Sequence, residues 1–263
     1  MSPLPPYLSK FGFRFGRASV HTARTMMLAE LTTLLTVVDA PDAGRSDYTE
    51  AIVEQNCLGK PSSNARSLTA EHLVDLYTLD PAVPLFRTMH YFWRRDPAAQ
   101  PLLALLCTYT RDTLLRTTTP FIMKLPLGTT LPRSTMEHYL AAQEPDRFSA
   151  ATLKSVAQNI NATWTQSGHL SGRAVKVRTP AAPTAGSVAF ALLLGYWAGL
   201  RGDFLFTSPF IELQDCSFDT ALALAAEGSR RGWIVLNRVA TVTEVLFPGL
   251  IPPKEMGWLH EHE

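Results

Sequence analysis

The sequence predicts a mainly α-helical fold: a helical bundle with a helix-turn-helix in its N-terminal half and a winged-helix-like α+β domain at its C-terminal end. Apolar residues recur at spacings of three and four through most of the chain, as on the buried face of a helix. Ser, Thr or Asp precedes many of these segments, where its side chain can cap a helix. Hydrophobic residues make up 46% of the 263 residues, enough for a full core.

We expect three parts: an arm at 1–17, a helical domain at 18–125 and a C-terminal domain at 131–263. The arm contains prolines that disfavour a helix, and its basic residues alternate with phenylalanines: Lys10, Arg14 and Arg17 with Phe11, Phe13 and Phe15. It could lie along a phosphate backbone or dock on the protein's own core. We favour docking, because three aromatic side chains are poorly solvated in water.

The helical domain begins with a periodic segment at about 19–38. A short helix is expected at 47–56, then a turn at 58–61, and then a helix that Ser62 or Ser63 can cap. Two Asp-Pro pairs each supply a capping oxygen followed by a proline at the first helical position. These pairs predict helices at 81–95 and 97–118. The second helix is expected to end at residues 117–120.

In the C-terminal part, Ser134 and Glu137 fit a capping box, and a second helix is expected at 149–164. Residues 173–178 alternate like a strand. The last 80 residues then predict helices at 184–200, 208–213 and 218–231, and strands at 204–206, 233–236 and 239–245, with a turn at Asn237-Arg238. Helix, strand, helix, helix, strand, turn, strand is the element order of a winged helix.

The helix-turn-helix predicted at 47–78 is the first candidate for a nucleic-acid contact. Such a unit lays its second helix in the major groove, where residues at the helix start reach base edges. Asn pairs with adenine, Arg with guanine, and hydroxyls bond phosphate oxygens. The residues in question are Lys60, Ser62, Ser63, Asn64, Arg66 and Ser67. The alternative is an ordinary helical corner with a polar face.

The second candidate is the stretch 151–182, which contains no Asp or Glu. Its residues Arg173, Lys176 and Arg178 could form a wing that grips phosphates, each neutralised phosphate adding about one unit to the salt dependence of binding. The alternative is a solvated surface hairpin.

No catalytic motif is visible, and we expect neither an enzyme nor a cofactor. A net charge of +1 excludes a global basic field, although 18 Arg against 6 Lys suits phosphate or carboxylate recognition. His260 and His262 around Glu261 are a poor metal site, because a chain end supplies no rigid geometry. Three scattered cysteines and the lack of a signal-peptide or membrane-span pattern favour a cytoplasmic protein.

Several short motifs carry a resemblance to a known family. Glu54-Gln-Asn56-Cys-Leu58-Gly59, followed by serines and Arg66, is similar to the N-terminal stretch of BrxA-type proteins of bacteriophage-exclusion (BREX) systems. Similar segments run through residues 45–250: Leu76-Tyr77-Thr-Leu79-Asp80-Pro81, Pro84-Leu85-Phe86-Arg87, Pro101-Leu102-Leu103-Ala104-Leu105-Leu106, Arg111-Asp112, Leu115-Arg116 and Thr163-Trp164-Thr165-Gln166-Ser-Gly168-His-Leu170.

The resemblance implies a non-enzymatic accessory protein of phage defence that binds duplex DNA. Its partners would be a methyltransferase, an ATPase and a phosphatase-like protein of the same system. The resemblance implies no binding to a membrane. It implies no catalytic residue, and the arm at 1–17 has no counterpart in it. The alternatives are a protein-interaction scaffold that does not bind nucleic acid, and an enzyme whose site carries no recognisable motif.

Overall fold

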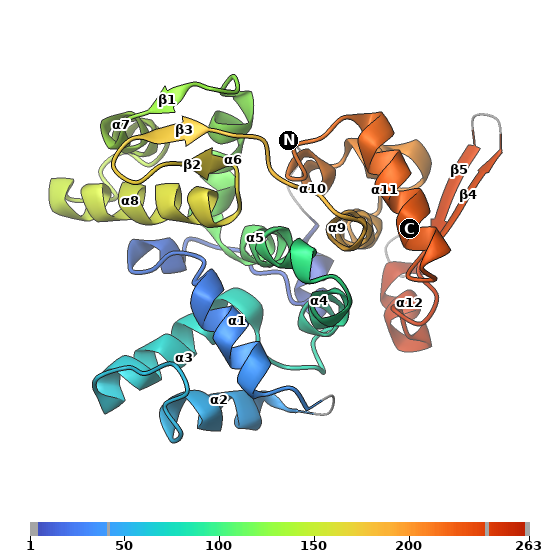
Figure 1. The fold of residues 1–263 in the computed structure, drawn as a ribbon, viewed down its shortest axis with the longest axis horizontal. Helices are drawn as coiled ribbons and strands as arrows, with labels where there is room; N and C mark the ends of the chain where they lie inside the picture. Colours follow the sequence, from blue (N-terminus) through green and yellow to red (C-terminus); the bar gives the residue numbers. More distant parts are fainter. Residues whose placement is uncertain (1–4, 41–42, 240–241, 261–263) are drawn as a thin grey trace.

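The structure is a computed structural model and describes residues 5–40, 43–239 and 242–260. Helices dominate these residues, and the strands form two small antiparallel sheets, so the predicted mainly helical class is confirmed (Figure 1). None of the helices in the described ranges has the length and apolar character needed to cross a bilayer.

The described residues before 125 are helical or irregular. Their elements, in chain order, are η1 (Pro6–Phe11), η2 (Val20–Thr22), α1 (Leu28–Val37), α2 (Arg45–Val53), α3 (Ser63–Tyr77), α4 (Pro84–Arg95), η3 (Pro97–Ala99), α5 (Gln100–Arg111) and α6 (Thr113–Lys124). The single helix expected at 97–118 is therefore wrong. Asp112 has extended backbone angles and caps a new helix through the Leu115 N–H, and α6 continues through Pro120.

The later part adds the strands. Its elements are β1 (Thr130–Leu131), α7 (Arg133–Gln143), α8 (Ala150–Gln166), β2 (Leu170–Ser171), β3 (Lys176–Arg178), α9 (Ala185–Trp197), η4 (Gly202–Thr207), α10 (Pro209–Glu212), α11 (Phe218–Arg230), β4 (Val235–Val239), β5 (Val242–Leu246) and α12 (Pro253–His260). The first sheet has the order β1-β3-β2, and β4 pairs with β5 in the second.

Two details of the predicted C-terminal winged helix are wrong. The segment expected as a strand at 204–206 is the 3-10 helix η4, in which Leu205 and Phe206 are both buried, whereas neighbouring residues of a strand point to opposite faces. The expected turn at Asn237-Arg238 lies within β4. There Asn237 is opposite Glu244 and donates a hydrogen bond of 2.9 Å to its carboxylate.

One continuous cluster of buried apolar side chains runs from Leu8 to Leu259 and takes in residues of all three predicted parts. The N-terminal segment belongs to it: Leu8, Phe11 and Phe13 are buried, and the Phe11 ring lies 4.9 Å from that of Trp197. The prediction that this segment docks on the protein's own core is therefore confirmed for Phe11 and Phe13, whereas Phe15 is exposed.

Candidate nucleic-acid interface

The elements from α6 to β3 form one lobe, which Figure 1 shows at the upper left. Helix α8 packs against α7, and β3 lies between β1 and β2, antiparallel to both. The pairing in this short sheet fixes the position of the turn between β2 and β3. The lobe thus consists of a helix, a strand, two packed helices and a two-stranded hairpin that joins the first strand.

The starts of α7 and α8 differ in how they are capped. The capping box predicted at Ser134 is absent, because α7 begins two residues earlier, after Pro132, and Glu137 accepts a hydrogen bond of 2.6 Å from Arg133 instead. Helix α8 begins close to the expected position and is capped: the Ser149 hydroxyl accepts the Thr152 N–H at 3.2 Å. The exposed start of α8 therefore offers the positive end of a helix dipole.

Helix α8 has a buried face and an exposed face. Val156, Ile160 and Trp164 are fully buried, at helical spacing. The exposed face consists of small, hydroxyl, amide and basic side chains: Ala151, Lys154, Ser155 and Gln158. No Asp or Glu occurs in the sequence from 147 to 202. Nothing on this helix opposes the approach of a polyanion.

Residues 172–175 form the tight turn between β2 and β3. Gly172 has a positive φ of 91°, and a Cβ there would lie 2.3 Å from the Val175 carbonyl oxygen, so the turn requires glycine. Arg173 is exposed on this turn, so the strand expected at 173–178 begins only at Lys176. Lys176 is half-buried, donates to the Gly172 carbonyl at 2.7 Å, and has a pKa lowered by burial.

Arg178 does not face solvent, so its predicted phosphate contact is wrong. Its side chain is 2% exposed and forms a two-pronged ion pair with Asp215, at 2.7 and 2.8 Å. It also donates to the backbone carbonyls of Ile122 and His169. Position 178 lies on the inner side of the hairpin, so the guanidinium joins β3 to the α10–α11 connection rather than to a ligand.

His169 lies in the same buried cluster and makes the stability of the protein depend on pH. Burial, opposed by Asp215 and aided by Arg178, lowers the His169 pKa to about 4. The folded protein therefore holds this ring neutral, while the unfolded chain binds a proton below a pKa of about 6.5.

We expect the free energy of unfolding to fall by up to about 1.4 kcal/mol per pH unit as the pH drops from 6.5 towards 4. Urea unfolding at several pH values measures this slope. His169→Gln should flatten it, whereas the control His138→Gln, at an exposed position, should keep the wild-type slope. A slope that His169→Gln leaves unchanged would contradict the assignment.

A second buried network fixes the other side of the lobe. The His21 ring lies between α6 and α8: its Nδ1 is 3.0 Å from Asp112 and its Nε2 is 2.9 Å from the Thr163 hydroxyl. Asp112 also accepts from the Ser19 hydroxyl and the Val20 N–H. All three side chains of the His21 contact are at most 1% exposed, so the arrangement is structural and no substrate reaches it.

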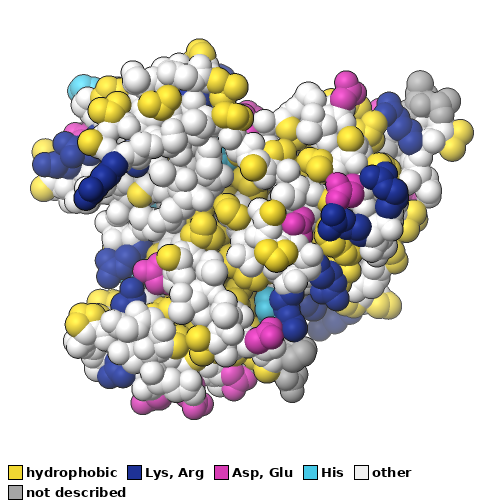
Figure 2. All heavy atoms as spheres, viewed as in Figure 1, with side chains coloured by type: hydrophobic (Ala, Val, Ile, Leu, Met, Phe, Trp, Pro, Cys, Tyr) yellow, Lys and Arg dark blue, Asp and Glu magenta, His cyan; other side chains and the backbone are white. Residues whose placement is uncertain are grey.

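The two helices of the predicted helix-turn-helix are α2 and α3, but their connection and their charges differ from the prediction. Residues 54–62 separate the helices, more than the about three or four residues of a DNA-reading turn. Lys60 is paired with Glu30 at 3.1 Å. Helix α2 and the residue after it add Asp47, Glu50 and Glu54, and Figure 2 shows acidic side chains gathered over α2.

The predicted contact residues are thus divided between two parts of the molecule. Those at the start of α3 are solvent-accessible: Ser62, Ser63, Asn64 and Ser67 are exposed, and Arg66 is half-buried. Arg173 and Lys176 lie in the upper-left lobe, whereas α3 lies at the lower left (Figure 1). Lys154, Ser155 and Gln158 were not predicted as contacts, although the acid-free stretch and the Ser149 cap were visible signals.

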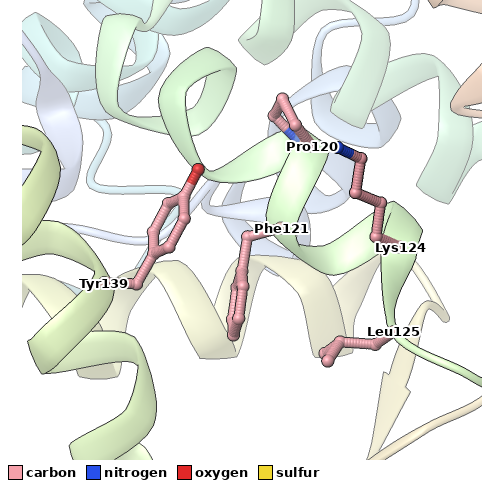
Figure 3. A pocket seen from close by; sticks show the side chains of 5 residues that line it. All are labelled: Pro120, Phe121, Lys124, Leu125 and Tyr139. Atoms are coloured by element: carbon pink, nitrogen blue, oxygen red, sulfur yellow. The ribbon is translucent and has the colours of Figure 1, made fainter.

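The lobe also has a shallow apolar pocket on the side formed by α6 and α7, with a volume of about 240 Å³. Figure 3 shows Phe121 and Tyr139 projecting from the two helices; their rings stack with centroids 4.6 Å apart. Tyr139 also donates to the Thr117 carbonyl at 3.0 Å. These contacts pack α7 against α6, so the pocket is a by-product of helix packing.

Comparison with protein-family models gives no match, and comparison with curated proteins gives none either. Among the described residues, no three His, Cys, Asp or Glu side chains lie together as a metal site would require. Glu261 and His262 of the weak metal candidate are outside the described residues.

Proposed function

We propose that the lobe of residues 113–178 is a winged helix and that the protein binds duplex DNA through it. The sequence α6, β1, α7, α8, β2, turn, β3 has the element order predicted above, but about 70 residues earlier in the chain than the sequence suggested. In such a unit α8 is the helix that enters the major groove, and the turn at 172–175 is the wing.

The observation that carries this proposal is the exposed face of α8. Lys154 and Arg173 would contact phosphates, while Ser155 and Gln158 would reach base edges, where Gln pairs with adenine. The backbone N–H groups at the start of α8, after Ser149, would bind a phosphate without adding a formal charge. The net charge of +1 is then sufficient, because α8 and the turn at 172–175 lie in a stretch, 147–202, without Asp or Glu.

Fluorescence anisotropy with labelled duplex DNA at two salt concentrations tests this. Replacing Lys154 and Arg173 by alanine removes two phosphate contacts and should reduce the salt slope of log Kd by about two units. The matched control replaces Arg45 and Arg230, exposed arginines outside the lobe. The proposal is contradicted if the wild type does not bind DNA at low salt, or if the control variant shows the same reduction in salt slope.

We further propose that the protein has no catalytic role and serves as an accessory component of a phage-defence system. The similarity to BrxA-type proteins supports this role, as does a lobe whose exposed groups suit binding more than chemistry. Duplex DNA would bind at the α8 face. A methyltransferase, an ATPase and a phosphatase-like protein would act beside this protein.

The second candidate function is an assembly subunit without nucleic-acid binding. Four exposed apolar side chains on the β4–β5 hairpin and η4 favour it: Phe204, Val239, Val242 and Leu246. Binding to a purified methyltransferase or ATPase of the same system, lost in a Val242→Ser, Leu246→Ser variant, would support this candidate. Retained DNA affinity in that variant would show that the two surfaces act separately.

A further inference from the structure

A basic pocket of about 310 Å³ lies beside α4, outside the lobe proposed to bind DNA. One wall is a single face of α4 with residues at helical spacing: Arg87, His90, Tyr91, Arg94 and Arg95. The opposite wall is Gly249 and Leu250. Three arginines and a histidine line the pocket without any Asp or Glu among the lining residues. Figure 2 shows Lys and Arg side chains gathered over α4.

Each of the three guanidinium groups contacts another group of the protein. Arg87 donates to the buried Glu255 carboxylate at 2.6 Å. Arg94 pairs with Asp39 at 3.2 Å. Arg95 lies 3.7 Å from the centre of the Tyr91 ring and donates to the Tyr91 carbonyl at 3.1 Å. Fixed side chains lose less conformational entropy on binding than free ones.

These contacts leave most of the donors open. A guanidinium has five N–H groups in a planar fork that matches the oxygens of a phosphate. Among the described residues, each of the three arginines engages another protein group through one terminal nitrogen. The remaining N–H groups of Arg94 and Arg95 are on exposed residues at the pocket rim.

His90 contributes a neutral polar group to the pocket wall. Burial, aided by the Arg94 charge, lowers the pKa of His90. The ring stacks on Phe86 with centroids 5.6 Å apart, and its Nε2 has no hydrogen-bond partner among the described residues. A buried nitrogen without a partner is costly to the fold.

We propose that this pocket binds a phosphate-bearing anion of about mononucleotide size. The volume is at the lower end of the about 300–1,000 Å³ of small-ligand pockets. The planar donors select phosphate over a monovalent anion because two N–H groups can bond two oxygens of one group. The site is independent of the proposed DNA-binding lobe, and either can exist without the other.

Isothermal titration calorimetry with pyrophosphate and adenosine monophosphate tests the pocket. The double variant Arg94→Gln, Arg95→Gln should weaken binding about tenfold or more, since two charge-assisted bonds are lost. The matched control, Arg230→Gln with Arg231→Gln, removes an adjacent pair of exposed arginines at the end of another helix. It should leave the affinity unchanged.

Two results overturn the proposal: no heat of binding with either probe at millimolar concentration, or equal affinity in the Arg94, Arg95 variant and the wild type. A further arm identifies the source of the phosphate. If the Arg94, Arg95 variant also loses affinity for duplex DNA, the pocket takes backbone phosphates. If its DNA affinity equals that of the wild type while pyrophosphate binding is weakened, the pocket takes a free phosphorylated molecule.

Discussion

Replacing Asp215 by alanine should lower the free energy of unfolding by about 3–5 kcal/mol. The change leaves the Arg178 guanidinium buried without its carboxylate, and an uncompensated buried charge costs this much. Asp215 also accepts the Ala181 N–H, which would lose its partner. Urea denaturation monitored by tryptophan fluorescence measures the loss.

The matched control is Glu137→Ala, which breaks the ion pair with the half-exposed Arg133. Exposed pairs of this kind contribute about 0–1 kcal/mol. The double variant Arg178→Met, Asp215→Ala should recover part of the lost stability, because neither charge remains buried alone. If Asp215→Ala cost no more than Glu137→Ala, the ion pair would not anchor β3.

Asp112→Ala should have an effect of similar size, about 3–5 kcal/mol. The carboxylate accepts hydrogen bonds from the Ser19 hydroxyl and from two backbone N–H groups, of Val20 and Leu115, and contacts the His21 ring. Removing it leaves those donors buried without partners and removes the cap of α6.

Thermal unfolding and urea titration check this prediction, with Asp75→Ala as the control, because Asp75 pairs with Arg14 at the surface. Burial alone would raise the pKa of Asp112, but His21, Ser19 and the Leu115 N–H hold it well below its usual range. Its stabilisation is therefore present above the unfolded pKa of about 3.9 and is lost at lower pH. A loss below about 1 kcal/mol, the value for exposed pairs, would contradict the assigned role.

Much of the helical framework could be predicted from local signals. Ser62, Ser149 and Ser217 precede helices that begin where expected, because an N-cap hydroxyl acts on its own next three residues. The docking of Phe11 and Phe13 followed from their poor solvation. The strand expected at 173–178 is observed only at Lys176–Arg178, and Arg173 lies on the turn before it.

The position of the lobe that we propose as a winged helix could not be predicted, for a physical reason. Pro120 and the three threonines before it are typical of a helix end, but the hydroxyls of Thr117, Thr118 and Thr119 bond carbonyls four residues earlier and the helix continues. Without α6 and the two-residue strand β1, residues 113–178 did not show the winged-helix order. The burial of Arg178 depends on Asp215, which no local pattern connects to it.

Crosslinking to DNA from single positions tests the central claim most directly. In a background with Cys57 and Cys216 changed to serine, Ser155→Cys on α8 or Ser63→Cys on α3 would carry a photoreactive group, both being exposed serines. We expect duplex DNA to crosslink at 155 and not at 63. Crosslinking at 63 alone, or at neither position under conditions where DNA is bound, would contradict the assignment of α8 as the helix that enters the groove.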